Sequence, residues 1–206
     1  MKPLAVLTVL LASLLAGCAS LNKDQCITAD WHTIGYEDGA NGLADTRIGS
    51  HREACAKHGV TPNLQQYRDG HSEGLKSFCK PRNGFNRARS GYQYKGICPA
   101  SLEPDFLAGY EAGQQIYQAE SDINDLEGLL HNNEAEQQEI EQQLHDKEAV
   151  LLSSRTPEQR RRVVYQDIAQ LKKRQGSLEQ QRDDLIRDLA NSESWLHELR
   201  NRYSYY

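Results

Sequence analysis

The sequence lacks any apolar run long enough to cross a bilayer. Its longest such run, residues 4–15, is shorter than the ~20 apolar residues that a spanning helix needs. Lys2 precedes the run, and the small residues Ala16 and Gly17 follow it. This order is typical of a secretory signal, so residues 1–17 are predicted to be removed as a signal peptide.

The segment Leu15-Ala16-Gly17-Cys18 resembles the bacterial lipobox, whose cysteine receives a diacylglycerol and an N-acyl chain. An ordinary signal peptide with a chance cysteine is the alternative. Several acyl chains give stable anchoring, so Cys18 is predicted to hold the chain to a membrane. Ala19 and Ser20 stand where inner-membrane retention is associated with aspartate. We therefore expect the outer membrane, facing the periplasm, with surface exposure left open.

Motifs of common catalytic sites are scarce. Gly70-His71-Ser72-Glu73-Gly74 fits the Gly-x-Ser-x-Gly pattern, but it falls inside a predicted helix rather than on the strand-to-helix turn that a serine nucleophile needs. The sequence has no phosphate-cradling loop. Glu37, Asp38, Asp69 and Glu73 could supply the paired carboxylates of a glycosidase, but such residues are more often on the surface. No enzyme and no cofactor beyond the covalent lipid is predicted.

The second half lacks a net positive charge, because acidic residues outnumber basic ones there. Residues 19–102 carry a net charge of +3, whereas residues 103–206 carry −9. Nucleic acid attracts clustered positive charge, so a nucleic-acid partner is not expected. The asymmetry indicates two regions of different character.

Four cysteines remain once Cys18 is lipidated, an even number that favours disulfides in an exported protein. Three pairings are open. We predict Cys26–Cys55 and Cys79–Cys98, because neighbours in sequence close the shorter loops. After a tether over residues 18–25, residues 26–102 would form a small disulfide-stapled helical domain, whose few large apolar side chains make a thin core.

Tyrosine precedes glycine by three residues in three similar segments, at Tyr36, Tyr67 and Tyr110. Glycine disfavours helices by ~1 kcal/mol relative to alanine, so its recurrence at helical spacing indicates close helix packing with tyrosine as filler. A groove for a sugar or peptide, lined by these three tyrosines, is the functional alternative.

Capping and turn-forming residues divide this domain into predicted helices. Asp30 is a suitable N-cap, and the predicted helices cover residues 31–43, about 47–58, and 62–79. Turn signals follow between Pro81 and Pro99. The alternation of Tyr92, Tyr94 and Ile97 there predicts a short β-hairpin.

A basic segment occupies residues 76–95, with interleaved aromatics and no acidic residue. Lys80, Arg82, Arg87 and Arg89 could meet lipid headgroups, lipopolysaccharide phosphates or anionic peptidoglycan. The favoured interpretation is a solvated basic loop, with docking on the chain's own acidic half as one option.

His51, Cys55 and His58 share a helix face, as metal ligands would. We instead expect a disulfide at Cys55 and two solvated histidines, and hence no metal site.

Residues 103–206 repeat apolar residues in alternating steps of three and four, from Ile123 to Leu151 and from Val164 to Leu199. This spacing is the coiled-coil signature. The break at residues 153–157 predicts an antiparallel hairpin, with Thr156 as cap and Pro157 as first helical residue. A coiled coil of two chains is the alternative.

Folding back at this break pairs residues whose numbers sum to 311 or 312. The expected pairs are Leu144–Ile168, Ile140–Leu171, Leu126–Leu185, Ile123–Leu189, Ile116–Leu196 and Gln137–Gln175. The last pair is polar, and matched polar residues fix register at some cost in stability.

The first half also resembles a known family. The matching residues are Cys26, Asp30-Trp31, Gly35-Tyr36-x-Asp38-Gly39, Cys55, Tyr67-x-x-Gly70-x-x-x-Gly74-Leu75, Cys79, Asn83-Gly84 and Tyr94-x-Gly96-x-Cys98-Pro99. This order resembles a family of small bacterial lipoproteins known as a domain of unknown function, DUF2799, over roughly residues 1–115. The resemblance implies a lipid anchor and a periplasmic address, but no activity and no catalytic residue.

The sequence thus predicts a mainly α-helical, non-enzymatic envelope scaffold or adaptor whose hairpin contacts another protein. The alternative is a module that binds glycan, such as peptidoglycan, or lipopolysaccharide.

Overall fold

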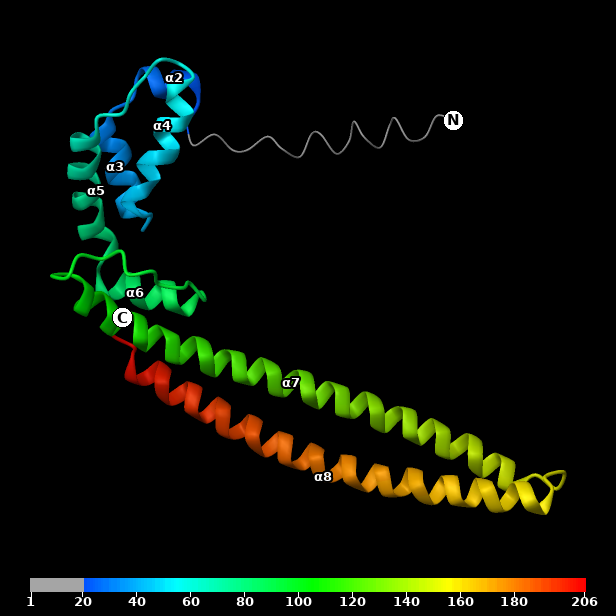
Figure 1. Cartoon of the computed structure of the whole chain (residues 1–206). Coiled ribbons are helices and arrows are strands. Elements are labelled where there is room, and N and C mark those ends of the chain that lie inside the picture. Colours follow the sequence, from blue (N-terminus) through cyan, green and yellow to red (C-terminus); the bar gives the residue numbers. More distant parts are fainter. Residues whose placement is uncertain (1–20) are drawn as a thin grey trace, which may run out of the picture. The chain divides into compact units, whose positions relative to one another are not determined.

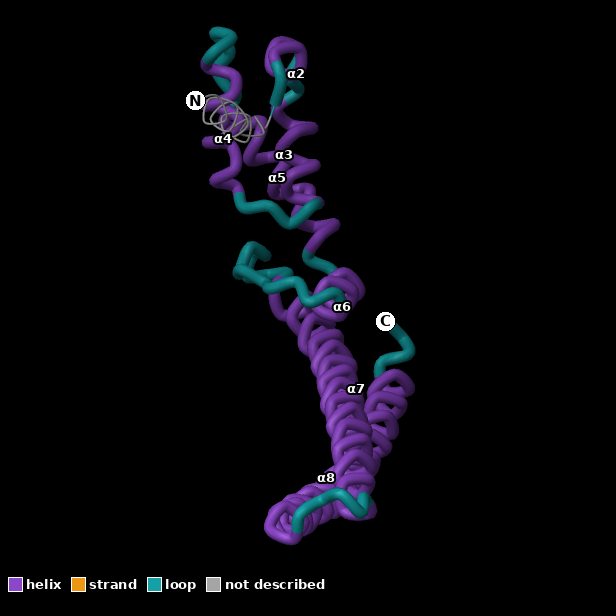
Figure 2. The backbone as a smooth tube through the Cα atoms, turned by 90° about the vertical axis from the view of Figure 1, so that its right-hand side faces the viewer, coloured by secondary structure: helices purple, strands orange, loops and turns teal. Residues whose placement is uncertain are grey.

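The computed structural model describes residues 21–206, all of them in helices, turns or loops without a strand (Figure 2). The predicted signal peptide and Cys18 lie outside the described residues. Between residues 21 and 206, no helix combines the length and apolarity that a membrane span requires. The mainly helical class is therefore confirmed.

The chain divides into two compact units. One contains the residues up to Gly84 together with Gln93–Tyr110, and the other contains Phe85–Tyr92 and Glu111–Tyr206. This division differs from the predicted boundary at residues 102/103. The first turns of the long helix that begins at Glu103 group with the stapled domain, whereas Phe85–Tyr92 group with the hairpin.

The helices follow one another along the chain (Figure 1). Their bounds are α2 Lys23–Ile27, α3 Trp31–Ala40, η2 Asp45–Arg47, α4 Ile48–Ala56, α5 Leu64–Phe78, α6 Pro81–Arg89, α7 Glu103–Leu152 and α8 Glu158–Arg202. The connection from α6 to α7, residues 90–102, is a long loop. Helix α2 occupies part of the predicted tether, so only the chain before Lys23 is left for that role.

Side-chain caps explain where α3 and α5 begin. The carboxylate of Asp30 accepts hydrogen bonds from the backbone N–H groups of His32 and Thr33, at 3.0 and 3.3 Å, as predicted. Helix α5 begins after Asn63 rather than at Pro62, because the Asn63 side chain accepts from the N–H of Gln66.

The two predicted disulfides are present. Cys26–Cys55 joins α2 to α4 with Cα atoms 5.4 Å apart, and Cys79–Cys98 joins the end of α5 to the loop before α7 with Cα atoms 5.8 Å apart. All four cysteines are buried. In a chain-entropy account each crosslink stabilises a thin core by ~3 kcal/mol.

The predicted β-hairpin near Tyr92 is wrong. Residues 81–89 form α6, and its start is tied to α5 by Asn83, whose amide donates to the Phe78 carbonyl at 2.8 Å. The following loop wraps around the Tyr94 hydroxyl, which donates to Glu103 and accepts from the Cys98 N–H. These bonds satisfy the loop locally, so no strand ladder is needed.

Helices α7 and α8 form the predicted antiparallel hairpin within the second unit (Figure 1). Its core has two clusters of apolar side chains. Towards the turn, Ile140, Leu144, Val164, Ile168 and Leu178 are buried together, with Val150, Leu151 and Leu171 packed against them. Near the C-terminus, Phe85, Ala112, Ile116, Ala119, Leu196 and Leu199 are buried, with Ile123, Tyr203 and Tyr206 packed against them.

Candidate functional site

Helices α3 and α5 pack through glycine. A methyl group added at Gly35 or Gly39 would overlap the carbonyl oxygen of Tyr67 or His71 on α5. Likewise, a methyl group at Gly70 or Gly74 would overlap a carbonyl oxygen of α3. The two helices therefore meet backbone to backbone, which confirms the close packing predicted for these glycines. The predicted role of tyrosine as filler holds for Tyr67, which is buried, but not for Tyr36, which is 39% exposed.

The third tyrosine–glycine segment repeats this arrangement on α7. In the first unit, a methyl group at Gly109 would overlap the Pro81 carbonyl oxygen. In the second unit, one at Gly113 would overlap the Phe85 carbonyl oxygen. The sequence repeat thus corresponds to one way of packing helices, used twice.

A polar cluster lies buried beside the α3–α5 contact. Asp38 Oδ2 accepts hydrogen bonds from the Tyr67 hydroxyl at 2.7 Å and from His51 Nε2 at 2.8 Å. Arg47 Nε lies 3.8 Å from the other carboxylate oxygen. The relative exposures of Asp38, His51 and Tyr67 are 8%, 3% and 0%. We call these three residues the Asp38 cluster.

The charge state of this cluster follows from its contacts. Burial opposes ionisation of Asp38, but hydrogen bonds from His51 and Tyr67 and the nearby positive charges outweigh it and lower its pKa below the ordinary value. Burial raises the pKa of Tyr67, and the hydrogen bond to Asp38 raises it further. Asp38 is therefore an acceptor, and Tyr67 stays a protonated donor.

The Asp38 cluster contradicts two expectations drawn from the sequence. Asp38 and His51 were expected on the surface, yet both are buried, and His51 of α4 bonds to Asp38 of α3. Glu37, Asp69 and Glu73 are exposed as expected. Buried groups that satisfy one another are typical of a structural network.

The proposed metal face is not assembled. Cys55 is in its disulfide, His51 bonds to Asp38, and His58 is exposed. In the described part of the chain, no group of three His, Cys, Asp or Glu residues is arranged to hold a metal ion.

A shallow recess of about 410 Å³ lies next to His71 in the first unit. It is lined by Ala44, Asp45, His71, Leu75, Lys95, Gly96 and Ile97. His71 Nε2 donates to the Leu43 carbonyl at 2.7 Å, and its ring stacks on Tyr67. The histidine is thus fixed by the fold, and only Asp45 and Lys95 contribute charges.

The three tyrosines of the predicted ligand groove do not line an accessible face together. Tyr67 is fully buried, whereas Tyr36 is 39% exposed. Tyr110 is half-buried, and its hydroxyl accepts from the Tyr94 N–H at 3.2 Å. A groove that needs all three side chains is therefore not formed.

The basic residues have different surroundings. Lys80 and Arg82 are exposed. Arg87 lies over the ring of Tyr92, 5.6 Å from its centroid. Arg89 lies 3.6 Å from Glu120 of α7, which is consistent with a basic segment docking on the acidic half.

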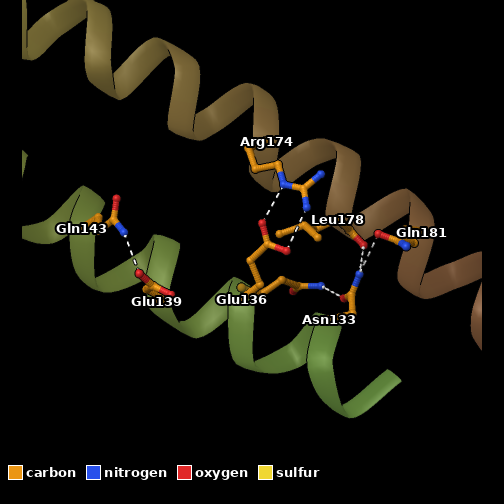
Figure 3. Close-up of polar contacts among 8 residues, drawn as sticks. Asn133, Glu136, Glu139, Gln143, Arg174, Leu178 and Gln181 are labelled. Atoms are coloured by element: carbon orange, nitrogen blue, oxygen red, sulfur yellow. Dashed lines mark hydrogen bonds and ion pairs between the residues drawn. The ribbon is translucent and has the colours of Figure 1, made fainter. Parts of the chain in front are cut away.

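Polar contacts fix the register in the middle of the hairpin (Figure 3). Asn133 of α7 is 5% exposed, and its amide donates to the Leu178 carbonyl of α8 at 3.1 Å. Arg174 forms a bidentate pair with Glu136, at 2.7 and 2.8 Å. The numbers of the first pair sum to 311, as predicted, and those of the second sum to 310, one short of the predicted 311 or 312.

One predicted polar pair differs from the structure. Gln137 donates to Asn133 of its own helix at 2.7 Å, rather than facing Gln175 as a hydrogen-bonded pair. Asn133 belongs to the predicted seam, but its role was missed. It is the shorter side chain, and this lets it stay buried between the two helices and reach the opposite backbone.

The turn between α7 and α8 is held by side chains. Thr156 donates to the Val150 carbonyl at 2.7 Å instead of capping α8, whose N-cap is Pro157. Arg161 donates to the carbonyls of Thr156 and Ser153, at 3.0 and 2.7 Å. The turn is therefore a defined structure and can present a constant surface.

Beside this turn lies an open recess of about 380 Å³ in the second unit. Its lining residues are Leu151, Glu158, Arg161, Arg162, Tyr165 and Gln166. Tyr165 is 70% exposed, and Leu152 at the end of α7 is 85% exposed. The hairpin thus ends in an apolar surface with arginines around it.

Part of the chain matches a family model. The model of a family described as Protein of unknown function (DUF2799) matches residues 30–115. These residues include α3 to α6, the Asp38 cluster and the first turns of α7. No curated protein and no solved structure matches the chain.

Proposed function

We propose that this chain, which matches the DUF2799 family model over residues 30–115, is a lipid-anchored, non-enzymatic scaffold or adaptor of the bacterial cell envelope. Cys18 would carry the lipid at the periplasmic face of the outer membrane. The α7–α8 hairpin would contact another envelope protein. The family match covers little of the acidic hairpin, most of which lies beyond the matched residues.

The observation that carries the proposal is the hairpin itself. At 1.5 Å per residue, the 45 residues of α8 extend for about 70 Å. Asn133 and the Arg174–Glu136 pair hold the two helices in one register. An arm of this length with a fixed register and an exposed apolar end is suited to reaching and binding a partner.

Glycan or lipopolysaccharide binding has less support from the geometry. Tyr67 is buried, and Arg87 and Arg89 are engaged with Tyr92 and Glu120. If this alternative held, reversing the charges of Lys80 and Arg82 would abolish adsorption to purified peptidoglycan or lipopolysaccharide. We expect no such dependence.

The proposal is tested by comparing proteins that co-purify with the full chain and with a chain whose arm is removed. Residues 123–189 would be replaced by a short Gly-Ser linker, since residues 122 and 190 face each other in this register. The core cluster around Ile116 and Leu196 is retained. We expect a small set of envelope proteins to depend on the arm. Identical sets from both chains would reject the adaptor role.

A further inference from the structure

We infer that the tip of the hairpin is a docking site for an acidic protein segment with one large apolar anchor residue. The tip surface is formed by Leu151, Arg155, Arg160, Arg161, Arg162 and Tyr165. The inference rests on the proposed adaptor function and specifies where on the arm the partner binds and what chemistry it has.

The recess at the tip provides a place for the anchor. Its 380 Å³ accommodate a single large side chain, and Leu151, the Tyr165 ring and the aliphatic stems of Arg161 and Arg162 supply apolar walls. Tyrosine and arginine around a central pocket are the residues that most often carry binding energy in protein interfaces.

Apolar exposure is concentrated at this end of the arm. Two of the three most exposed large hydrophobic side chains in residues 21–206 are Leu152 and Tyr165. Val163, on the same first turns of α8, is 46% exposed. A folded chain gains nothing by leaving these side chains in water, so their concentration beside a recess indicates a binding surface.

The positive charge of the tip indicates a negatively charged partner. Residues 153–165 contain four arginines and one glutamate, whereas residues 103–206 as a whole carry −9. Arg161 is used by the turn, and Arg162 pairs with Glu158 at 3.1 Å. Within residues 21–206, the guanidinium groups of Arg155 and Arg160 make no hydrogen bond or ion pair, so they are available to carboxylates of a partner.

A protein segment fits this surface better than an anionic membrane does. The open recess can take one inserted side chain, whereas a membrane anchor needs a broad apolar surface that enters the lipid.

The test is a selection from a phage-displayed library of random twelve-residue peptides on the full chain in detergent. Parallel selections use Tyr165→Ala and Arg160→Glu, with Tyr205→Ala and Arg187→Glu as matched controls at exposed positions elsewhere in the second unit. We expect enriched peptides with several Asp or Glu residues around one Leu, Phe or Trp. Their affinity should fall at least fivefold with either tip variant and stay unchanged with the controls.

Three results would overturn the inference: no enrichment, enrichment of neutral or basic peptides, or acidic peptides that bind the tip variants as well as the parent chain. Vesicles of phosphatidylglycerol and phosphatidylethanolamine are tested in parallel. Binding to these vesicles that is lost in Tyr165→Ala would assign the tip to a membrane instead. If arm-dependent partners co-purify while the tip selection fails, the adaptor function stands and its contact lies elsewhere on the hairpin.

Discussion

Four glycines of α3 and α5 each face a carbonyl oxygen of the opposite helix, while Gly128 and Gly176 of the hairpin face open space. Whether a glycine is required therefore depends on its neighbour rather than on its helix. A methyl group at one of the four must push two backbones apart, whereas in open space it only improves helix propensity.

Gly39→Ala is accordingly expected to lower the free energy of unfolding by about 2 kcal/mol, because the overlap with the His71 carbonyl outweighs the gain in propensity. Gly128→Ala, the matched control, should raise it by ~0.5–1 kcal/mol. Urea denaturation of both variants measures the difference. Equal effects would mean that the α3–α5 contact is looser than described.

Asp38→Asn should lower stability at neutral pH by about 2 kcal/mol, because two buried donors lose their charged acceptor. The pKa of Asp38 in the folded protein lies below its ordinary value of 3.8, so its ionised form stabilises the fold above that pH. This contribution is lost as the pH falls from about 4 through the folded-state pKa.

Denaturation midpoints between pH 2 and 7 test this assignment. The difference between parent and Asp38→Asn should shrink as the medium becomes acidic. Asp69→Asn, at an exposed carboxylate of α5, serves as the control and should differ little from the parent at any pH. A constant penalty for Asp38→Asn at all pH values would show that its charge does not matter.

Among the helical elements, the α7–α8 hairpin depends on its register, because its core is one row of side chains between two helices. Ile140 and Leu171 lie in one cluster near the turn. Cysteines at positions 140 and 171 should therefore form a disulfide within one chain under mild oxidation.

Cysteines at 140 and 178 are the control for this crosslink, because residue 178 lies about 10 Å further along α8. They should not join. Non-reducing gels and peptide mapping distinguish the products. If crosslinks formed only between two chains, the structure would be an oligomeric coiled coil rather than a hairpin.

Replacing Asn133 is expected to raise stability, whereas replacing Asp38 is expected to lower it. Asn133→Leu is expected to raise the stability of the hairpin by about 1–2 kcal/mol, since an apolar side chain there would leave no buried amide to satisfy. The cost should be specificity, seen as new 140–178 crosslinks or as oligomers in light scattering. A destabilised variant with unchanged register would contradict this role.

The elements also show what local sequence can and cannot predict. The seam of α7 and α8 was predictable because its period is local, and its register followed from one turn. The segment after Pro81 was not, because Asn83-Gly84 is typical of a turn, yet Gly84 lies in α6 where the Phe106 carbonyl approaches it. A glycine used in packing and a glycine used in a turn look alike without the partner helix.

The same limit applied to the site. The disulfides followed from loop length, but the Asp38 cluster depends on α4 packing against α3, which no local pattern encodes. One signal was present: Asp38 lies between Gly35 and Gly39 on the face that packs. A carboxylate in that position has to be buried and therefore needs donors.

For the whole molecule, the predicted lipid anchor decides where the hairpin works. Cys18→Ser should remove labelling by radioactive palmitate and release the chain from the membrane fraction. Ala19→Asp combined with Ser20→Asp, the control, should keep the label. A labelled or membrane-bound Cys18→Ser chain would contradict lipidation at this residue.

The most direct test of the adaptor role is photo-crosslinking in living cells from a probe at Arg155, in the turn of the hairpin, analysed by mass spectrometry. A probe at Arg187, on the exposed side of α8, reports contacts elsewhere on the arm. We predict a discrete adduct with an envelope protein from position 155, joined through an acidic segment. Position 187 should give little. Absence of adducts from both positions would contradict a protein-binding arm and leave the hairpin as a spacer.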